Sequence, residues 1–291
     1  MGPNYYLPFL LVSAAARKTK CRLPRVAQSA GRSVMDDWPL LNGLMALVVL
    51  VPLAYTVVFS DKLRKWRRRW YSEFVGELRV VWNAVLDEKK RTFLAPLAEA
   101  VSNDDQLRLK KSIRILEIGC GAGTNLRYYP DGASLVMVDC SSSFEERLLE
   151  NVKKYPRLFL ERIVYSCAQD MCEITDQSVD AVVSTNVLCC TNDERQVLAE
   201  ILRVLAPGGK FYMIEPQPAD KLSFTFALQW ILTNSGIWPY LFDGFRLTRD
   251  YECSVREAGF SAVESTTFDL PRSAHFVFRI VSKQMCLVAT K

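Results

Sequence analysis

The sequence predicts an α/β domain built on a doubly wound, mostly parallel sheet, preceded along the chain by an apolar N-terminal segment. Three observations carry this prediction. Residues 113–118 form a short apolar run that leads into a glycine-rich turn. Residues 135–138 form a second apolar run, which ends in the lone carboxylate of Asp139. Apolar strands and an amphipathic helix then alternate up to residue 215, which is typical of strand–helix–strand units with parallel strands.

The turn after the first strand carries glycines at alternate positions. Gly119, Gly121 and Gly123 follow Glu117 in the pattern E-x-G-x-G-x-G, whereas dinucleotide-binding loops read G-x-G-x-x-G. Glycines let the backbone turn tightly and approach a ligand without a Cβ atom in the way. A ligand of an open parallel sheet binds at the carboxyl ends of the strands, where Asp139 can accept hydrogen bonds from ribose hydroxyls. The turn therefore predicts a nucleoside-bearing cofactor, and the residues expected to line this part of its site are Glu117, Gly119, Cys120, Gly121, Gly123 and Asp139.

A third strand is predicted at residues 163–166. The segment that follows it contains Gln169, Asp170 and Met171, at the place where such a fold receives the adenine ring. Gln169 and Asp170 can hydrogen-bond the exocyclic amine, and Met171 can pack on a face of the ring. We therefore expect these three residues to complete the cofactor site.

The second half of the sheet is predicted from two further apolar runs. Residues 178–188 form an almost continuous apolar strand, of the type that is buried on both faces. An amphipathic helix is expected at 197–205, and the Pro-Gly-Gly sequence at 207–209 is expected to stop it before a strand at 210–215. A late strand is expected at 274–280.

The positive charge of the chain is confined to its first part. The formal net charge is +5, but residues 1–70 carry +9, which leaves −4 for the remainder. A slightly acidic domain lacks the basic surface that nucleic-acid binding requires, so no nucleic-acid partner is expected.

Nine cysteines are spread along the chain without a C-x-x-C pair, and there is one histidine. Neither a disulfide framework nor a bound metal is therefore expected.

A membrane anchor helix is predicted at residues 38–60. The stretch 38–59 contains no charged residue over 22 positions, which is about the length of a helix that spans the hydrocarbon core. Basic residues and two tryptophans follow directly. Basic residues beside a membrane span favour the cytoplasmic side, and tryptophans favour the headgroup layer. Membrane lipids are therefore the predicted partners of residues 38–70. The sequence leaves open whether the segment crosses the bilayer or lies in one leaflet. It also leaves open whether translation starts at Met1 or at Met35, and what the oligomeric state is.

The chain is thus predicted to have four parts. They are a basic arm at 1–37 that is disordered or a targeting segment, the anchor at 38–60, a basic juxtamembrane segment with capping helices at 61–100, and the α/β domain at 101–291. Within the α/β domain, an aromatic-rich segment at 216–247 could close over the site as a lid, pack on the sheet or rest on a membrane. The sequence leaves these alternatives open.

The glycine turn resembles motif I of the class I S-adenosylmethionine-dependent methyltransferases, and residues 83–290 resemble the methyltransferase-like seven family within that class. The second resemblance is carried by residues 116–123, 129–130, 169–171, 187–189, 203–209 and 241–249. The last of these is the most specific, because general cofactor binding demands no such sequence. The family comprises small membrane-anchored enzymes that methylate alkyl thiols. The resemblance implies a Rossmann-like fold, S-adenosylmethionine as cofactor and an endoplasmic reticulum membrane location with the catalytic domain facing the cytosol; lipid droplets are a further site.

The predicted function is methylation of the sulfur of a small apolar thiol, by in-line displacement at a membrane surface. A sulfonium methyl group is already activated and a thiol is partly ionised near neutral pH, so positioning is expected to dominate. The residues expected on the acceptor side are Asn186, Glu215 and Asp243, although Asp243 could equally form a turn before Gly244. Two alternatives stay open: an O- or N-methyltransferase acting on a lipid, quinone or other small apolar acceptor, and a non-catalytic membrane or lipid-droplet scaffold.

Overall fold

The computed structural model describes residues 65, 74, 81–271 and 276–291, without the side chain of Phe276. The chain divides into two compact units, Met1–Ser60 and Asp61–Lys291, and every described residue lies in the second. The predicted arm at 1–37 and the predicted anchor at 38–60 therefore lie outside the described residues. Within the described ranges, no helix is both long and apolar enough to cross a membrane.

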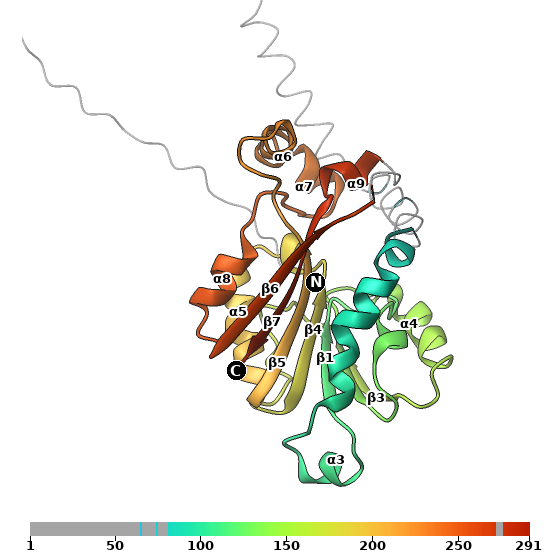
Figure 1. The fold of residues 1–291 in the computed structure, drawn as a ribbon. Coiled ribbons are helices and arrows are strands. Elements are labelled where there is room, and N and C mark those ends of the chain that lie inside the picture. Colours follow the sequence, from blue (N-terminus) through green and yellow to red (C-terminus); the bar gives the residue numbers. More distant parts are fainter. Residues whose placement is uncertain (1–64, 66–73, 75–80, 272–275) are drawn as a thin grey trace, which may run out of the picture. The chain divides into compact units, whose positions relative to one another are not determined.

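The second unit is built on a seven-stranded sheet in the order β3-β2-β1-β4-β5-β7-β6 (Figure 1). The strands are β1 (Arg114–Ile118), β2 (Ser134–Val138), β3 (Phe159–Val164), β4 (Val179–Thr185), β5 (Leu205–Pro216), β6 (Ala262–Asp269) and β7 (Lys283–Thr290). Strand β7 runs antiparallel to both of its neighbours, and the other paired strands are parallel. The strand order reverses between β1 and β4, where an open sheet leaves a crevice for a ligand. The predicted Rossmann-like sheet is confirmed.

Helices lie on both faces of this sheet and beyond both of its ends. They are the helix at 81–94, α3 (Asp105–Leu109), α4 (Glu145–Val152), α5 (Glu194–Val204), α6 (Phe224–Asn234), α7 (Ile237–Leu241), α8 (Tyr251–Glu257), α9 (Phe276–Ile280) and the 3₁₀ turns η1 (Ala95–Glu99), η2 (Leu126–Tyr128), η3 (Ser142–Phe144) and η4 (Leu188–Cys190). Several begin at a residue whose side chain accepts a hydrogen bond from the first turn: Asp193 for α5, Ser223 for α6 and Asp250 for α8. Asp and Ser are favoured at this position because the first N–H groups of a helix lack partners within it.

Alternate residues of the central strands point to opposite faces of the sheet. Leu116 and Ile118 of β1 are buried together with residues of α5 and α8. Ile115, which directly precedes Leu116 in the strand, is buried on the other side with Leu94 of the first helix and Leu148 of α4. This two-residue period gives the sheet an apolar core on each face.

A third apolar cluster joins the helix at 81–94 to α7 and α9. Its fully or nearly fully buried members include Leu86, Trp238 and Phe278. Figure 1 shows α6, α7 and α9 together beyond the end of β5, on the side where the parallel strands finish. The C-terminal half of the chain therefore builds a layer over the carboxyl end of the sheet.

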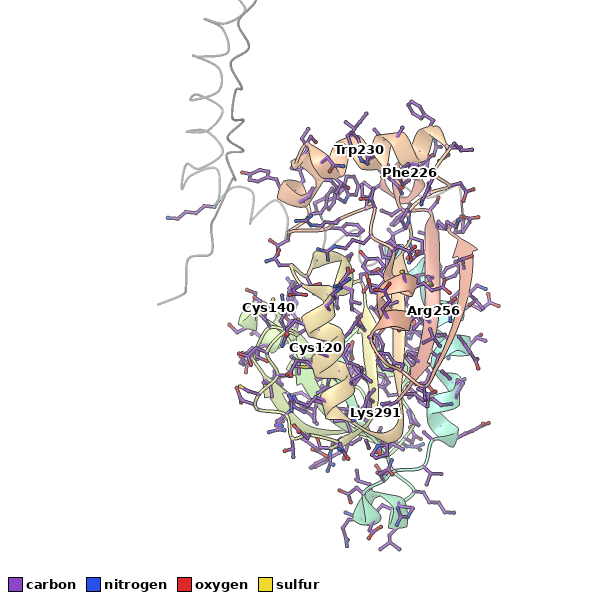
Figure 2. The ribbon with its side chains drawn as sticks, turned by 90° about the vertical axis from the view of Figure 1, so that its left-hand side faces the viewer. Cys120, Cys140, Phe226, Trp230, Arg256 and Lys291 are labelled. Carbon is purple, nitrogen blue, oxygen red and sulfur yellow. The ribbon has the colours of Figure 1, made fainter. Side chains whose placement is uncertain are left out.

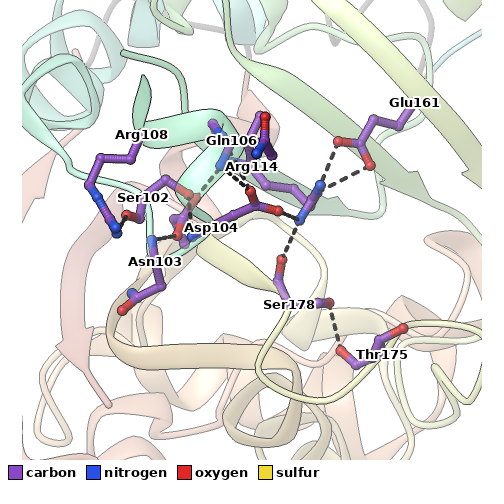
Figure 3. A network of polar contacts seen from close by, with 11 residues as sticks. Ser102, Asn103, Asp104, Gln106, Arg108, Arg114, Glu161, Thr175 and Ser178 are labelled. Carbon is purple, nitrogen blue, oxygen red and sulfur yellow. Dashed lines mark hydrogen bonds and ion pairs between the residues drawn. The ribbon is translucent and has the colours of Figure 1, made fainter. Parts of the chain in front are cut away.

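The opposite end of the sheet is fixed by a polar network around α3 (Figure 3). Asp104 caps α3 by accepting a hydrogen bond from the N–H of Gln106 at 2.8 Å. The guanidinium of Arg114 donates to the carboxylate of Glu161 at 2.9 Å and to the carbonyl of Ser178 at 3.0 Å. These contacts tie β1 to β3 and to the start of β4, away from the loops that follow the carboxyl ends.

Two expectations for secondary structure are wrong. In the described part of the strand expected at 274–280, the chain forms the helix α9, and β6 and β7 complete the sheet instead. The sequence at 207–209 does not separate helix from strand either, because α5 ends at Val204 and β5 begins at once. The pairing of β4 with β5 shifts from Leu205 to Lys210, so the Pro-Gly-Gly residues form an irregularity within β5.

Candidate active site

The predicted glycine turn lies at the carboxyl end of β1, beside the loop that follows β4. Its φ angles are 62° at Gly119, 49° at Gly121 and 74° at Gly123, in a region that other residues rarely adopt. A Cβ atom on Gly119 would collide with the side chain of Val187, and one on Gly123 would lie 2.7 Å from a side-chain carbon of Leu126. Packing between the loops therefore requires the first and third glycines, whatever their distance from a ligand.

Asp139 follows β2 and faces the middle of the glycine turn. The N–H of Gly121 donates to its Oδ2 at 2.8 Å, and the N–H of Ser141 donates to its Oδ1 at 3.0 Å. The side chain is only half-buried, and each carboxylate oxygen has a second lone pair that can accept another hydrogen bond. The carboxylate is thus held in a fixed orientation and can still accept from a pair of hydroxyl groups.

Glu117 lies near the end of β1 in a closed network. Its Oε1 accepts from Nδ2 of Asn125 at 2.9 Å, and its Oε2 accepts from the hydroxyl of Tyr129 at 2.6 Å. Burial raises the pKa of the carboxyl from 4.5 to about 7, and the Tyr129 hydroxyl and the Lys90 ammonium oppose this effect. The site therefore contains a carboxyl group that changes its charge near neutral pH.

Sequence reasoning missed Lys90, which the helix at 81–94 places beside Glu117. The lysine is 1% exposed, and its Nζ donates to Oδ1 of Asn125 at 2.9 Å and to Oδ1 of Asn83 at 3.1 Å. Asn125 thus bridges the lysine and Glu117. Burial lowers the pKa of Lys90 to about 8, and the charges of Glu117 and Asp87 act in the opposite direction. No sequence signal distinguishes this lysine, because a lysine in an amphipathic helix is normally exposed.

A cavity of about 110 Å³ opens between the helix at 81–94, the glycine turn and the loop after β4. Two residues that line it each have a buried polar atom without a hydrogen-bond partner among the described residues: the donor Nε1 of Trp82 and the acceptor Oδ1 of Asn186. Asn186 also has a φ of 56°, a strained value of the kind that gathers at ligand sites. Buried polar groups are almost always satisfied, so this unpaired donor and acceptor indicate a place for a polar ligand.

The predicted adenine-binding residues lie beyond the end of β3. Gln169 is half-buried and Asp170 is exposed, so both are open to a ligand. Met171 is completely buried in the core cluster that includes α5, and its N–H donates to Oε2 of Glu200 at 2.8 Å. Met171 therefore attaches this loop to α5 and presents no open face to the adenine ring, contrary to the expectation from sequence. Contacts of Gln169 and Asp170 with adenine stay a prediction.

Cys120 of the glycine turn is buried in the apolar core on one face of the sheet and is one of the residues that line the cavity. Burial raises the pKa of this thiol well above its usual range, and the carboxylates of Glu117 and Asp139 add to the effect. The thiol therefore stays protonated at physiological pH and acts as a packing group. In the part of the chain that the structure describes, no group of three or more His, Cys, Asp or Glu side chains could hold a metal ion.

Glu215, which the sequence analysis assigns to the acceptor side, is completely buried at the end of β5. Its Oε1 accepts from the N–H groups of Val187 at 2.7 Å and Leu188 at 2.9 Å, and its Oε2 accepts from the N–H of Cys189 at 3.3 Å. Burial raises the pKa of this carboxyl to about 7 in spite of these donors. Glu215 therefore fixes the loop after β4 and has no surface with which to touch an acceptor.

The segment 241–249 packs against the same loop. Gly244 lies so close to the carbonyl of Cys190 that an added Cβ atom would approach its oxygen to 3.2 Å. The guanidinium of Arg249 donates to the carbonyl of Leu188 at 3.0 Å and to that of Thr191 at 2.6 Å. The distinctive sequence of this segment thus shapes the loop on the acceptor side.

Asp243 is exposed and has a φ of 51°. Burial raises the pKa of the Cys140 thiol to about 11, and the charges of Asp139 and Asp243 contribute, so the carboxylate of Asp243 lies in the neighbourhood of the residue that follows Asp139. Asp139, Asn186 and Asp243 thus come from three loops at the same end of the sheet.

Comparisons with known proteins agree with this geometry. Residues 116–213 match the family described as a methyltransferase domain. The human protein named thiol S-methyltransferase TMT1A is 32% identical over 210 residues, which cover 72% of this chain and 83% of that protein. The rat protein named thiol S-methyltransferase TMT1B is 32% identical over 183 residues, which cover 62% of this chain and 70% of that protein.

Among solved structures, a Thermotoga maritima protein described as an S-adenosylmethionine-dependent methyltransferase, possibly acting on histamine nitrogen, has a TM-score of 0.50. It is 17% identical, and the match covers 76% of this chain and 97% of that one. A likeness at this level of identity supports the fold alone.

Proposed function

Since this chain belongs to the family of the thiol S-methyltransferases, we propose that it transfers the methyl group of S-adenosylmethionine to the sulfur of a small apolar thiol. The observation that carries the proposal is the cavity beside the glycine turn. A cationic and an anionic side chain lie there together with one unpaired donor and one unpaired acceptor. The amino-acid end of the cofactor is a zwitterion, so its two charged groups match this arrangement.

The residues of the cavity fit this zwitterion by charge. Lys90, with the indole N–H of Trp82, would hold the carboxylate of the cofactor, because both are donors. Glu117 and the side-chain oxygen of Asn186 would hold the ammonium group, because both are acceptors. Hydrogen bonds in which one partner is charged are stronger than those between neutral groups, so the four side chains would fix the amino-acid end firmly. When bound, S-adenosylmethionine supplies a methyl group on a positively charged sulfur atom.

The nucleoside end would lie along the neighbouring loops. Asp139, held by two backbone N–H groups, would accept hydrogen bonds from the ribose hydroxyls. Gln169 and Asp170, both open to solvent, would contact the exocyclic amine of adenine. No group that binds phosphate is needed along this path, in agreement with the acidic character of Glu117 and Asp139.

On the acceptor side, the chain acts by orienting and desolvating the thiol. A free thiol with a pKa of about 8.5 is a few per cent ionised at neutral pH and is strongly nucleophilic, so no dedicated base is required. Asn186 and Asp243 would orient the acceptor, and Glu215 keeps the loop after β4 in place. The contribution of the protein is therefore mainly alignment and exclusion of water.

The proposal includes a membrane location. Residues 38–60 would anchor the enzyme in the endoplasmic reticulum membrane, with the catalytic unit facing the cytosol and lipid droplets as a further location. The support is the uncharged stretch of 22 residues and the basic segment that follows it, because basic residues beside an apolar span favour the cytosolic side. Fluorescent tagging with organelle markers, on the full chain and on a chain lacking residues 38–60, tests this part.

The cofactor assignment is tested by replacing Asp139. The variant Asp139→Ala should bind S-adenosylhomocysteine about 10- to 100-fold more weakly, because each lost hydrogen bond to a charged group is worth about 1.5–3 kcal/mol. Asp131→Ala is the matched control, since Asp131 is an exposed aspartate on the turn before β2. Equal affinity of a folded Asp139→Ala variant, measured by calorimetry, would contradict the assignment.

A further inference from the structure

The outward face of α6 and its flanking turns is strongly apolar. Five of the eleven exposed large apolar side chains in the described ranges lie between residues 222 and 237. We call them the α6 face: Leu222, Phe224, Trp230, Ile231 and Ile237. Phe224 is 84% exposed and Trp230 is 55% exposed, and Figure 2 shows Trp230 on the outer helix layer. An exposed apolar patch of this kind marks a surface that is covered in use.

The orientation of α6 is fixed, so this exposure is not the result of a loosely placed helix. Gln229 on the inner side is buried, and it accepts from the N–H of Ala219 at 2.8 Å and donates to the carbonyl of Ile280 at 2.7 Å. Ser223 caps the first turn by accepting from the N–H of Phe226 at 3.0 Å. The buried amide and the cap together hold the apolar side chains outward.

The charges around the α6 face favour a lipid surface. Residues 222–242 contain no charged side chain over 21 positions. Lys221, directly before the α6 face, and Arg279 of α9, a helix that packs against α6, are exposed. The carboxylate of Asp220 is paired with Lys283 at 2.8 Å, and the exposed Asp243 follows the uncharged stretch on the side of the candidate active site. An apolar face with a tryptophan and a basic border is the pattern of helices that lie in the headgroup layer.

The same segment leads from the α6 face to the candidate active site. Trp238 of α7 is buried and stacks on Phe242 with ring centroids 4.2 Å apart. A few residues later, the N–H of Arg246 donates to the carbonyl of Cys189 at 2.9 Å, in the loop that Glu215 holds. The aromatic residues behind the α6 face are therefore continuous with the acceptor side.

We propose that the α6 face rests in the interfacial layer of a phospholipid membrane, so that apolar thiols dissolved in the lipid reach the acceptor side directly. This inference rests on the proposed thiol methylation for its substrate and on the α6 face alone for its contact with lipid. The membrane contact made by α6 is distinct from the predicted anchor at 38–60, since the two are separate segments of the chain.

The contact is measured on the full chain in vesicles of phosphatidylcholine and phosphatidylserine whose acyl chains carry bromine, a quencher of tryptophan fluorescence. The chain has six tryptophans, so the contribution of Trp230 is the difference between the wild type and Trp230→Phe. We expect a quenched component that Trp230→Phe removes. Equal quenching in the two proteins would overturn the contact.

Delivery of the substrate is measured with two thiols. The double variant Phe224→Glu/Ile231→Glu should raise KM for dodecanethiol in vesicles at least tenfold and leave KM for the water-soluble 2-mercaptoethanol unchanged. Leu109→Glu is the control, because Leu109 is 80% exposed at the end of α3, at the opposite end of the sheet (Figure 1). An unchanged KM for dodecanethiol in the double variant would overturn the delivery route.

The outcomes separate the two proposals. If the wild type methylates neither thiol, the proposed function fails while Trp230 quenching still decides the lipid contact. If quenching is absent and the double variant instead abolishes a concentration-dependent dimer, the α6 face binds a second copy of this chain and the proposal is overturned.

Discussion

Cofactor binding should weaken as Glu117 takes up a proton. Burial holds the pKa of this carboxyl at about 7, and only the ionised form attracts an ammonium group. With that pKa, about nine tenths of the Glu117 side chains are protonated at pH 6 and about 99% at pH 5. The dissociation constant of the cofactor should therefore rise about tenfold between pH 7.5 and pH 6 and further toward a hundredfold at pH 5, where each factor of ten is about 1.4 kcal/mol.

The stability of the ligand-free protein should respond to pH in the opposite direction. The pKa of Glu117 in the folded state is raised from 4.5 to about 7, so the folded protein binds this proton more tightly than the unfolded chain does. The stabilisation is fully present below pH 4.5 and is lost as the pH rises through about 7, with a magnitude of about 3 kcal/mol for this fully buried group. Protonation of Glu117 should thus stabilise the ligand-free protein against unfolding and, at the same time, weaken its affinity for the cofactor.

Calorimetric titration with S-adenosylhomocysteine between pH 5 and pH 8 measures the first effect. This ligand carries the same ammonium and carboxylate groups, and its α-amino group stays protonated below pH 7, so a change of affinity in the acid range reports on the protein. The matched variant is Glu117→Gln, which keeps the size of the side chain and should bind weakly with little dependence on pH. A dissociation constant that is flat in the wild type, or that varies equally in the variant, would refute the role of Glu117.

Three further predictions concern neighbouring residues. Lys90→Gln should weaken S-adenosylhomocysteine binding about 10- to 100-fold, because a charged hydrogen bond is lost. It should not lower Tm, because it also removes a costly buried charge. The control is Lys110→Gln, which replaces an exposed lysine and should change neither the affinity nor Tm. Gly119→Ala should lower the free energy of unfolding by about 1–3 kcal/mol through its positive φ and its collision with Val187, and urea titration should show partial recovery in Gly119→Ala/Val187→Ala. Glu215→Gln should raise KM for the thiol several-fold and leave the affinity for S-adenosylhomocysteine within about twofold, because it loosens only the acceptor-side loop. Steady-state kinetics measure KM, and calorimetry measures the affinity. A lower affinity for S-adenosylhomocysteine with an unchanged KM for the thiol would contradict this role.

The sheet and the glycine turn could be predicted from sequence because their signals are local. Apolar runs that end in glycine or aspartate define strands and their carboxyl ends, and the topology of parallel strands then brings Glu117 and Asp139 to one edge. The Pro-Gly-Gly sequence was misleading because its signal is also local: a turn sequence can be accommodated as an irregularity within β5 when the flanking strands pair. The helix α9 was missed because a five-residue apolar segment fits either a helix or a strand.

The cavity could not be predicted from sequence because it depends on contacts between distant segments. Lys90 meets Glu117 through the amide of Asn125, and these residues come from a helix, a strand and a loop. The roles of Met171 and Glu215 also follow from burial, which polarity does not reveal. A carboxylate after a strand suggests a ligand contact, but in Glu215 both oxygens are occupied by backbone N–H groups.

The central claim is tested most directly by methyl transfer from labelled S-adenosylmethionine to hexanethiol, hexanol and hexylamine, which differ only in the accepting atom. We predict that membranes containing the full chain form the methyl thioether, that the alcohol and the amine receive no label, and that folded Asp139→Ala loses the transfer. Label on the alcohol or the amine and none on the thiol would contradict the proposed thiol methylation.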